Sequence, residues 1–173
     1  ILSAQVDLLW FGGIGTYIRS SEEADAQVGD RANDPIRIAG NDVRARVIGE
    51  GANLGMTQRG RIEAARKGVK LNTDAIDNSA GVNTSDVEVN IKIALASAMR
   101  DERLTRAKRN VLLASMTDEV GHLVLRNNYL QSRAISLTER QGAANRAPLT
   151  RLMDRFEAIG QLNRKVETLP DDR

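Results

Sequence analysis

Short apolar runs separated by turn-forming residues dominate the first half of the chain. The run from Val6 to Phe11 is nearly continuous and ends at Gly12 and Gly13, which predicts a parallel strand buried on both faces. Further strands are expected over residues 36–38, 43–48 and 69–71. Two helices are expected, a short one that begins near Glu22 after a capping Ser20 or Ser21, and one from residue 57 or 58 to 67 that Gly68 ends. This texture predicts an α/β segment.

From residue 85 onward, the apolar spacing becomes helical. Ser85 and Glu88 have the S-x-x-E spacing of a capping box, which predicts that a helix begins there. Further helices are expected over residues 105–114 and 117–125, as one helix or two, and over 129–141 and 148–159. Asn127 and Asn128 are expected to end the first group, while Pro148 suits the first position of the last helix and Gly160 suits its end.

The composition is that of a folded globular protein, with 41% apolar and 28% charged residues among 173. Because there is no cysteine, disulfides and cysteine-based zinc or iron–sulfur sites are excluded. The single histidine, His122, is expected to be a structural residue within a helix. The aromatic content of 3% argues against a stacking platform for single-stranded nucleic acid. No apolar run approaches the roughly 18 residues of a membrane span, so a cytoplasmic protein without a membrane partner is expected.

The two halves of the chain, which meet near residue 90, differ in the sign of their net charge. Residues 1–90 carry 10 basic and 13 acidic residues, a net charge of −3, and residues 91–173 carry 15 and 10, a net charge of +5, which together give the overall +2. The basic half could bind nucleic acid or an acidic protein, or it could consist of helices with solvated arginine faces. The basic residues alternate with acidic ones and never form a run of five, which favours the second interpretation.

Three loops carry the candidate chemistry. The loop of residues 12–15 (GGIG) follows a predicted strand, where α/β sheets bind ligands, and glycine lets backbone N–H groups come close to one. Asn53, at the end of GEGAN (49–53), offers a carboxamide suited to a ribose or an amide. The stretch 74–86 is rich in side-chain oxygens, but it lacks the ligand order of an EF-hand, so no metal site is expected. Ser85 could cap a helix whose N-terminus also receives a carboxylate. Each loop also has a purely structural interpretation, as a tight turn or a cap.

Taken together and in this order, the three loops closely resemble the large, NAD-specific glutamate dehydrogenases of bacteria. The matching stretches are VDLLWFGGIGTYI (6–18), VIGEGANLGMTQRGRIE (47–63) and NTDAIDNSAGVNTSDVEVNIK (72–92). Two later stretches, RNVLLASMTDEVGHLVLRNNYLQ (109–131) and LNRKVETLP (162–170), resemble the same family. The resemblance therefore covers nearly the whole chain.

The resemblance implies an α/β fold, with a partial Rossmann-like parallel sheet and helices followed by an all-helical segment. Residues 1–90 would be the second half of the NAD-binding domain, and residues 91–173 a helical part of the C-terminal region. NAD is the implied cofactor, and glutamate and 2-oxoglutarate are the implied substrate and product. The implied cofactor residues are Gly12, Gly13, Asn53 and Asn78. Ser85 would hold the side-chain carboxylate of glutamate, with Val82 packed nearby.

The family's phosphate-binding loop and its catalytic lysine and aspartate are not in this sequence, and they are expected upstream of Ile1. The chain is therefore expected to be a fragment that is inactive alone, that works with the remainder of its own chain and that belongs to a homo-oligomer. Two alternatives stay open: a free-standing helical module that binds an acidic partner or nucleic acid, and a degenerate subunit that regulates a separate dehydrogenase.

Overall fold

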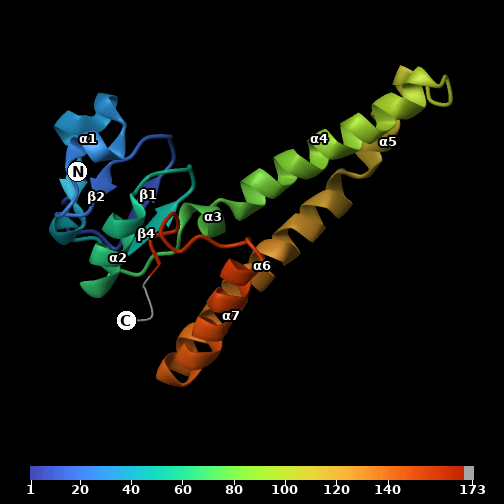
Figure 1. Cartoon of the computed structure of the whole chain (residues 1–173). Coiled ribbons are helices and arrows are strands. Elements are labelled where there is room, and N and C mark those ends of the chain that lie inside the picture. The colour runs from blue at the N-terminus through green and yellow to red at the C-terminus, as the bar shows by residue number, and fades with distance from the viewer. Residues whose placement is uncertain (170–173) are drawn as a thin grey trace.

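A computed structural model describes residues 1–169 of the chain. The strands and the shorter helices gather at one end of the molecule, and a long helical hairpin extends away from them (Figure 1). This arrangement confirms the predicted α/β fold, in which short parallel strands precede a helical stretch. Pro170, the last residue of the LNRKVETLP stretch, lies outside the described residues.

Two small parallel sheets form the strand region. Strand β1 (Leu8–Phe11) pairs with β4 (Val47–Glu50), and a bridge from Val47 to Lys70 extends this sheet beyond β4. Strand β2 (Ile18–Arg19) pairs with β3 (Ile38–Ala39), and Met56 bridges to Ile18. Because both pairs are parallel, the loops that follow β1 and β4 emerge at the same edge of the sheet.

Helix α2 (Gln58–Arg66) covers one face of this region. Its bounds follow local signals: the Thr57 hydroxyl accepts a hydrogen bond from the amide of Gly60 at 3.0 Å, and Gly68 has a φ of +94° just beyond the end. The predicted helix and its terminating glycine are confirmed. Three short helices connect the strands: α1 (Asp25–Val28), η1 (Arg31–Ile36) and η2 (Gly40–Asp42).

The core lies between α2 and the strands. Its members are buried hydrophobic residues that all come from the first 70 positions: Phe11, Ile18, Val43, Ala45, Ile48, Met56, Ala64 and Val69. The ring of Phe11 also stacks on that of Tyr17, with 5.5 Å between centroids. Outside this cluster, Val124 is the one other buried hydrophobic residue among residues 1–169. The strand region is therefore the part that can hold a site rigidly.

The prediction that the first strand is buried on both faces is wrong. Phe11 is 5% exposed and faces α2, whereas Leu8 and Trp10 are 56% and 59% exposed on the opposite face. The reason is that, within residues 1–169, only the face of β1 that carries Leu9 and Phe11 is covered. All four side chains of β1 are apolar and point alternately to its two faces, but Leu8 and Trp10 lie on a face that is left exposed.

Several short elements of the first half differ from their predictions. The helix expected near Glu22 begins at Asp25 instead, because the carboxylate of Glu23 accepts hydrogen bonds from the Ser20 amide and the Thr57 hydroxyl. The strand expected over 36–38 is confined to β3, since Pro35 lies inside η1. The strand expected over 43–48 begins later and runs on to Glu50, and the one expected over 69–71 is a single bridge at Lys70.

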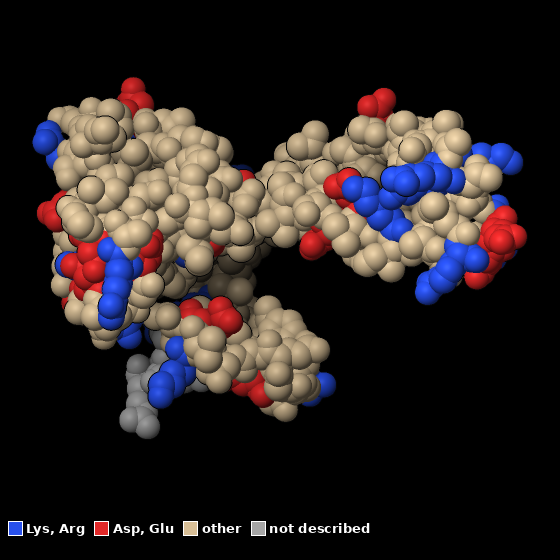
Figure 2. All heavy atoms as spheres, turned by 90° about the horizontal axis from the view of Figure 1, so that it is seen from above, with Lys and Arg blue, Asp and Glu red and all other residues tan. Residues whose placement is uncertain are grey.

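The hairpin consists of α4 (Ser79–Arg100), which leads away from the strands, and α5 (Arg106–Ser115) and α6 (Thr117–Gln141), which return along it (Figure 1). The turn α3 (Asp74–Asp77) precedes the hairpin, and η3 (Gly142–Asn145) and α7 (Arg146–Ala158) follow it. Basic side chains gather near its outer end, with acidic ones among them (Figure 2). His122 lies within α6, as expected for a helical position.

Two predicted helix boundaries are wrong in the hairpin. Ser85 does not cap a helix, because α4 begins at Ser79 and Ser85 is its seventh residue; Glu88 instead pairs with Lys92. Asn128 does not end a helix, because its amide donates to the Ile76 carbonyl and the Ser79 hydroxyl while α6 continues past it. The neighbouring Asn127 lies within the same unbroken helix.

The last helix also starts earlier than expected. Pro148 is its third residue rather than its first, which the helix tolerates because the amides of a first turn have no intrahelical partner. Gly160, with a φ of +71°, follows the end of α7 as predicted.

Candidate functional site

The loops that follow β1 and β4 meet at the carboxyl edge of the sheet. The amide of Ala52 donates to the carbonyl of Phe11 at 3.0 Å, so the GEGAN loop lies beside the loop that begins at Gly12. Two of the three loops singled out in the sequence are thus adjacent. This edge is where parallel α/β sheets place their ligands.

The third loop joins them through a pair of side-chain amides. The Nδ2 group of Asn78 donates to Oδ1 of Asn53 at 2.7 Å, across 25 residues of sequence. Asn53 is exposed and Asn78 is half-buried, at the point where α3 gives way to α4. Since Asn53 accepts in this bond, its own Nδ2 donors stay available to a ligand at this edge.

A buried ion pair supports the loop that carries Asn53. Glu50, the last residue of β4, is fully buried, and Arg61 of α2 donates to both of its carboxylate oxygens, from Nε at 2.6 Å and from Nη2 at 2.8 Å. Nη2 of Arg61 also lies 3.1 Å from Oδ1 of Asp74. Burial, the largest single effect, acts to lower the pKa of Arg61, but the hydrogen bonds with Glu50 and the negative charges of Glu50, Asp74 and Asp77 together outweigh it. The pKa is therefore raised, and the guanidinium is charged.

Two aspartates of α3 hold the backbone of the same loop. Asp74 accepts a hydrogen bond from the amide of Leu54 at 2.8 Å, and Asp77 accepts one from the amide of Glu50 at 3.0 Å. The amide of Asn72 donates to the other oxygen of Asp77 at 3.1 Å. Sequence reasoning missed this frame. Its only sequence signals were an acidic residue at the end of an apolar strand and the oxygen-rich stretch after residue 72.

Two glycines of GEGAN make room for a tryptophan. A Cβ atom on Gly51 would lie 2.1 Å from Cζ2 of Trp10, and one on Gly49 would lie 2.6 Å from Cε3 of the same ring. Trp10 lies directly opposite Gly49 in the parallel register. These glycines are therefore explained by packing within the chain.

Packing within the chain does not explain why positions 12 and 13 are glycines. A Cβ on Gly13 would meet no atom within 4 Å, and the nearest atoms to one on Gly12, both on the Trp10 ring, are 3.7 Å away. Both glycines are exposed. The space in front of them is open, which suits the close approach of a group from outside residues 1–169.

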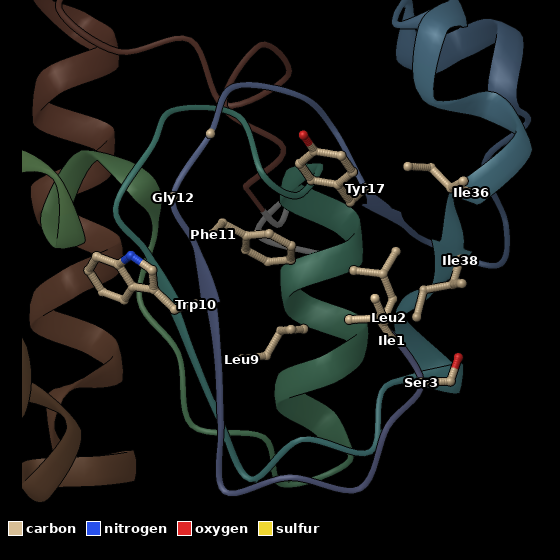
Figure 3. Close-up of a pocket in the computed structure, with 11 residues that line it drawn as sticks. Ile1, Leu2, Ser3, Leu9, Trp10, Phe11, Gly12, Tyr17, Ile36 and Ile38 are labelled. Atoms are coloured by element: carbon tan, nitrogen blue, oxygen red, sulfur yellow. The ribbon is translucent and has the colours of Figure 1, made fainter.

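An apolar pocket of about 600 Å³ opens beside these two glycines. Figure 3 shows Leu9 and Phe11 pointing to one side of β1, while Trp10 points to the other. The remaining wall comes from the N-terminal residues, Tyr17 and the segment that leads into β3.

A second pocket, of about 440 Å³, lies between the Asn53 loop, the start of α4 and helix α6. Its lining residues are Asn53, Leu54, Asp74, Ala75, Ser79, Val82, Asn83 and Gln131. The structure thus brings Asn53 and Val82 together. Ser85 is exposed and does not line this pocket, and its position inside α4 removes the helix-start argument for an anion there.

Two other features are absent from residues 1–169. No group of three or more histidine, aspartate or glutamate side chains in this range is arranged to hold a metal ion. None of the helices within the same range is both long and apolar enough to cross a membrane.

Comparison with known proteins adds to this geometry. Residues 1–138 match the family described as bacterial NAD-glutamate dehydrogenase, catalytic domain. The chain is 55% identical to an NAD-specific glutamate dehydrogenase of Halomonas elongata and 53% identical to one of Pseudomonas aeruginosa, in each case over 99% of its length. It is 49% identical to one of Mycobacterium tuberculosis over its full length. It spans only 11% of the length of each of these relatives.

Proposed function

Because this chain belongs to the bacterial NAD-glutamate dehydrogenase family, we propose that it works as part of a longer NAD-dependent glutamate dehydrogenase. The enzyme oxidises glutamate to 2-oxoglutarate and ammonia. Residues 1–90 form the second half of its Rossmann-like NAD-binding domain, and residues 91–173 belong to its helical C-terminal region. Helix α4 crosses this boundary without a break, so it joins the two parts rigidly.

The residues at the sheet edge fit the nicotinamide end of NAD. Asn53 and Asn78 present amide donors and acceptors at the carboxyl ends of parallel strands, and Gly12 and Gly13 leave open space next to them. Bound NAD supplies the hydride acceptor. The part of this chain is to orient the nicotinamide and its ribose through the two asparagines and to exclude water from one side.

The substrate contact falls on α4. Val82 and Ser85 are three residues apart, so they lie on the same side of the helix. The Ser85 hydroxyl donates a hydrogen bond to the side-chain carboxylate of glutamate, while Val82 packs against its methylene groups. This contact rests on the hydroxyl alone, since no helix terminus lies at Ser85.

The groups that carry out the chemistry come from the remainder of the polypeptide. The phosphate-binding loop and the catalytic lysine and aspartate lie in the part of the enzyme that precedes these residues. The enzyme is a cytoplasmic homo-oligomer that needs no metal ion, nucleic acid or membrane.

The hydrogen bond between Asn78 and Asn53 carries this proposal, because it joins two loops of the family pattern at the ligand-binding edge of a parallel sheet. The test compares the full polypeptide that contains this sequence with the 173-residue chain alone, by glutamate-dependent formation of NADH. The full polypeptide is expected to form NADH and the chain alone to form none. A full polypeptide that forms no NADH with glutamate would overturn the proposal, and so would a chain that is active alone.

A further inference from the structure

One asparagine that lines the pocket between the Asn53 loop and helices α4 and α6 has a side-chain amide without a hydrogen-bond partner within residues 1–169. It is the Nδ2 group of Asn83, which is buried and forms no hydrogen bond within residues 1–169. A buried donor without an acceptor costs free energy, and most such groups in folded proteins are satisfied by another protein group or by an ordered water. Because Asn83 lines a pocket and not packed core, a ligand that enters the pocket can supply the acceptor once the side chain turns toward it.

The other lining groups limit what that ligand can be. No lysine or arginine lines the pocket, and its one carboxylate, Asp74, is already occupied by Arg61 and by the amide of Leu54. A carboxylate ligand would therefore find no counter-charge there. Leu54 and Ala75 provide apolar wall, which suits a flat and uncharged ring.

The pocket also adjoins two of the proposed cofactor residues, because Asn53 lines it and is hydrogen-bonded to Asn78. A neutral ring that carries an amide, next to these two asparagines, matches the nicotinamide of NAD. Asn83 offers a donor of the kind that the carbonyl oxygen of a carboxamide accepts.

We infer that Asn83 binds the carboxamide of the nicotinamide ring, with its Nδ2 group donating to the carboxamide oxygen. This inference rests on the proposed function and adds a positioning residue to it. By fixing the carboxamide, Asn83 sets which face of the ring is turned toward the substrate.

The test measures binding to the full polypeptide by calorimetry, with Asn83→Ala compared with the parent. Two ligands are used: NAD, and ADP-ribose, which lacks the nicotinamide ring. Loss of one hydrogen bond in a buried site is expected to raise the Kd for NAD roughly five- to tenfold. The Kd for ADP-ribose is expected to stay the same, because Asn83 does not contact that part of the cofactor.

A third ligand and a matched variant sharpen the result. The acetylpyridine analogue of NAD keeps the carbonyl oxygen but lacks the amide hydrogens, so Asn83→Ala is expected to weaken its binding by the same factor. Asn90→Ala, an exposed residue of the same helix outside the pocket, is expected to change none of the three affinities. An unchanged Kd for NAD in Asn83→Ala, or an equal loss for NAD and ADP-ribose, would overturn the inference. A parent that binds neither NAD nor ADP-ribose would instead overturn the proposed function on which it rests.

Discussion

Arg61 donates two hydrogen bonds to the carboxylate of Glu50, from Nε at 2.6 Å and from Nη2 at 2.8 Å. Glu50 is the residue that precedes the loop carrying Asn53. The side chains are 8% and 0% exposed, so this ion pair lies within the interior and joins the last residue of β4 to α2. Both partners are buried, and each is therefore stable there only in the presence of the other.

Substitution of Arg61 is expected to destabilise the chain strongly. In Arg61→Met, Glu50 becomes a buried charge that has lost its guanidinium, and the free energy of unfolding is expected to fall by about 3–5 kcal/mol. Urea unfolding followed by circular dichroism measures this. The double variant Glu50→Leu with Arg61→Met should lose less than the sum of the two single variants. A loss below about 1 kcal/mol in Arg61→Met would contradict this account of the pair.

The close approach of Trp10 to GEGAN predicts a movement of the indole on substitution of Gly51. In Gly51→Ala the new methyl group cannot coexist with the indole in its present position, so the exposed ring must turn away, at a small cost in stability. Trp10 is the only tryptophan in the sequence, so its fluorescence reports the movement. Gly13→Ala is the matched control and should change neither stability nor fluorescence. Identical emission from Gly51→Ala and the parent would count against the packing described.

Substitution of Gly13 is expected to weaken cofactor binding without changing the stability of the chain. In the full polypeptide, Gly13→Val places a side chain in the open space proposed for the nicotinamide end of NAD. The Kd for NAD is expected to rise about tenfold or more, while the unfolding midpoint stays near that of the parent. Gly121→Ala, at a helical glycine that also has open space around it, should leave the Kd unchanged. Tight NAD binding by Gly13→Val would show that this loop does not adjoin the cofactor.

Acidification should weaken the region around η1. The backbone amide of Thr16 and the side chain of Asn33 donate to Asp30, and these bonds hold the pKa of its carboxyl below the usual value of about 3.9. Because the folded-state pKa is the lower one, the ionised carboxylate stabilises the fold above about pH 4. This stabilisation is lost as the pH falls through the folded-state pKa.

The corresponding experiment compares Asp30→Asn with the parent in urea at about pH 7 and about pH 3. The variant should be less stable at the higher pH, and the difference should shrink at the lower one. Asp7→Asn serves as control, because the Asp7 carboxylate pairs with Arg46 on the surface and contributes little. A stability difference that grows on acidification would mean that the Asp30 pKa is raised by folding and not lowered.

Local signals in the sequence were sufficient for some elements and misleading for others. Helix α2 was predicted nearly to the residue, because its start and end depend on Thr57 and Gly68, which act within one turn. Helix α4 was not, because the capping-box spacing at Ser85 has no effect where the helix already begins at Ser79. That start is held by Asn128, which lies 49 residues away in sequence. No local pattern reports such a contact.

The candidate site also contains residues that the sequence pointed to and residues that it did not. The sequence pointed to Asn53 through its loop and to Asn78 through the family resemblance, and their side chains meet, as expected for neighbouring loops at one sheet edge. The frame of Glu50, Arg61 and Asp74 was not identified, because spacing along the chain does not say that a strand end, a helix face and a turn share one buried point. Asn83 was also missed, since its significance lies in a buried amide without a partner and not in a motif.

The most direct test of the central claim is the rate of glutamate-dependent NADH formation by the full polypeptide and by its Asn53→Ala variant. We expect the parent to form NADH and Asn53→Ala to lower kcat/KM about ten- to a hundredfold, since it loses the amide that we propose for the cofactor contact and the acceptor that holds Asn78. An Asn53→Ala variant as active as the parent would contradict the claim that this chain forms the nicotinamide side of the active site.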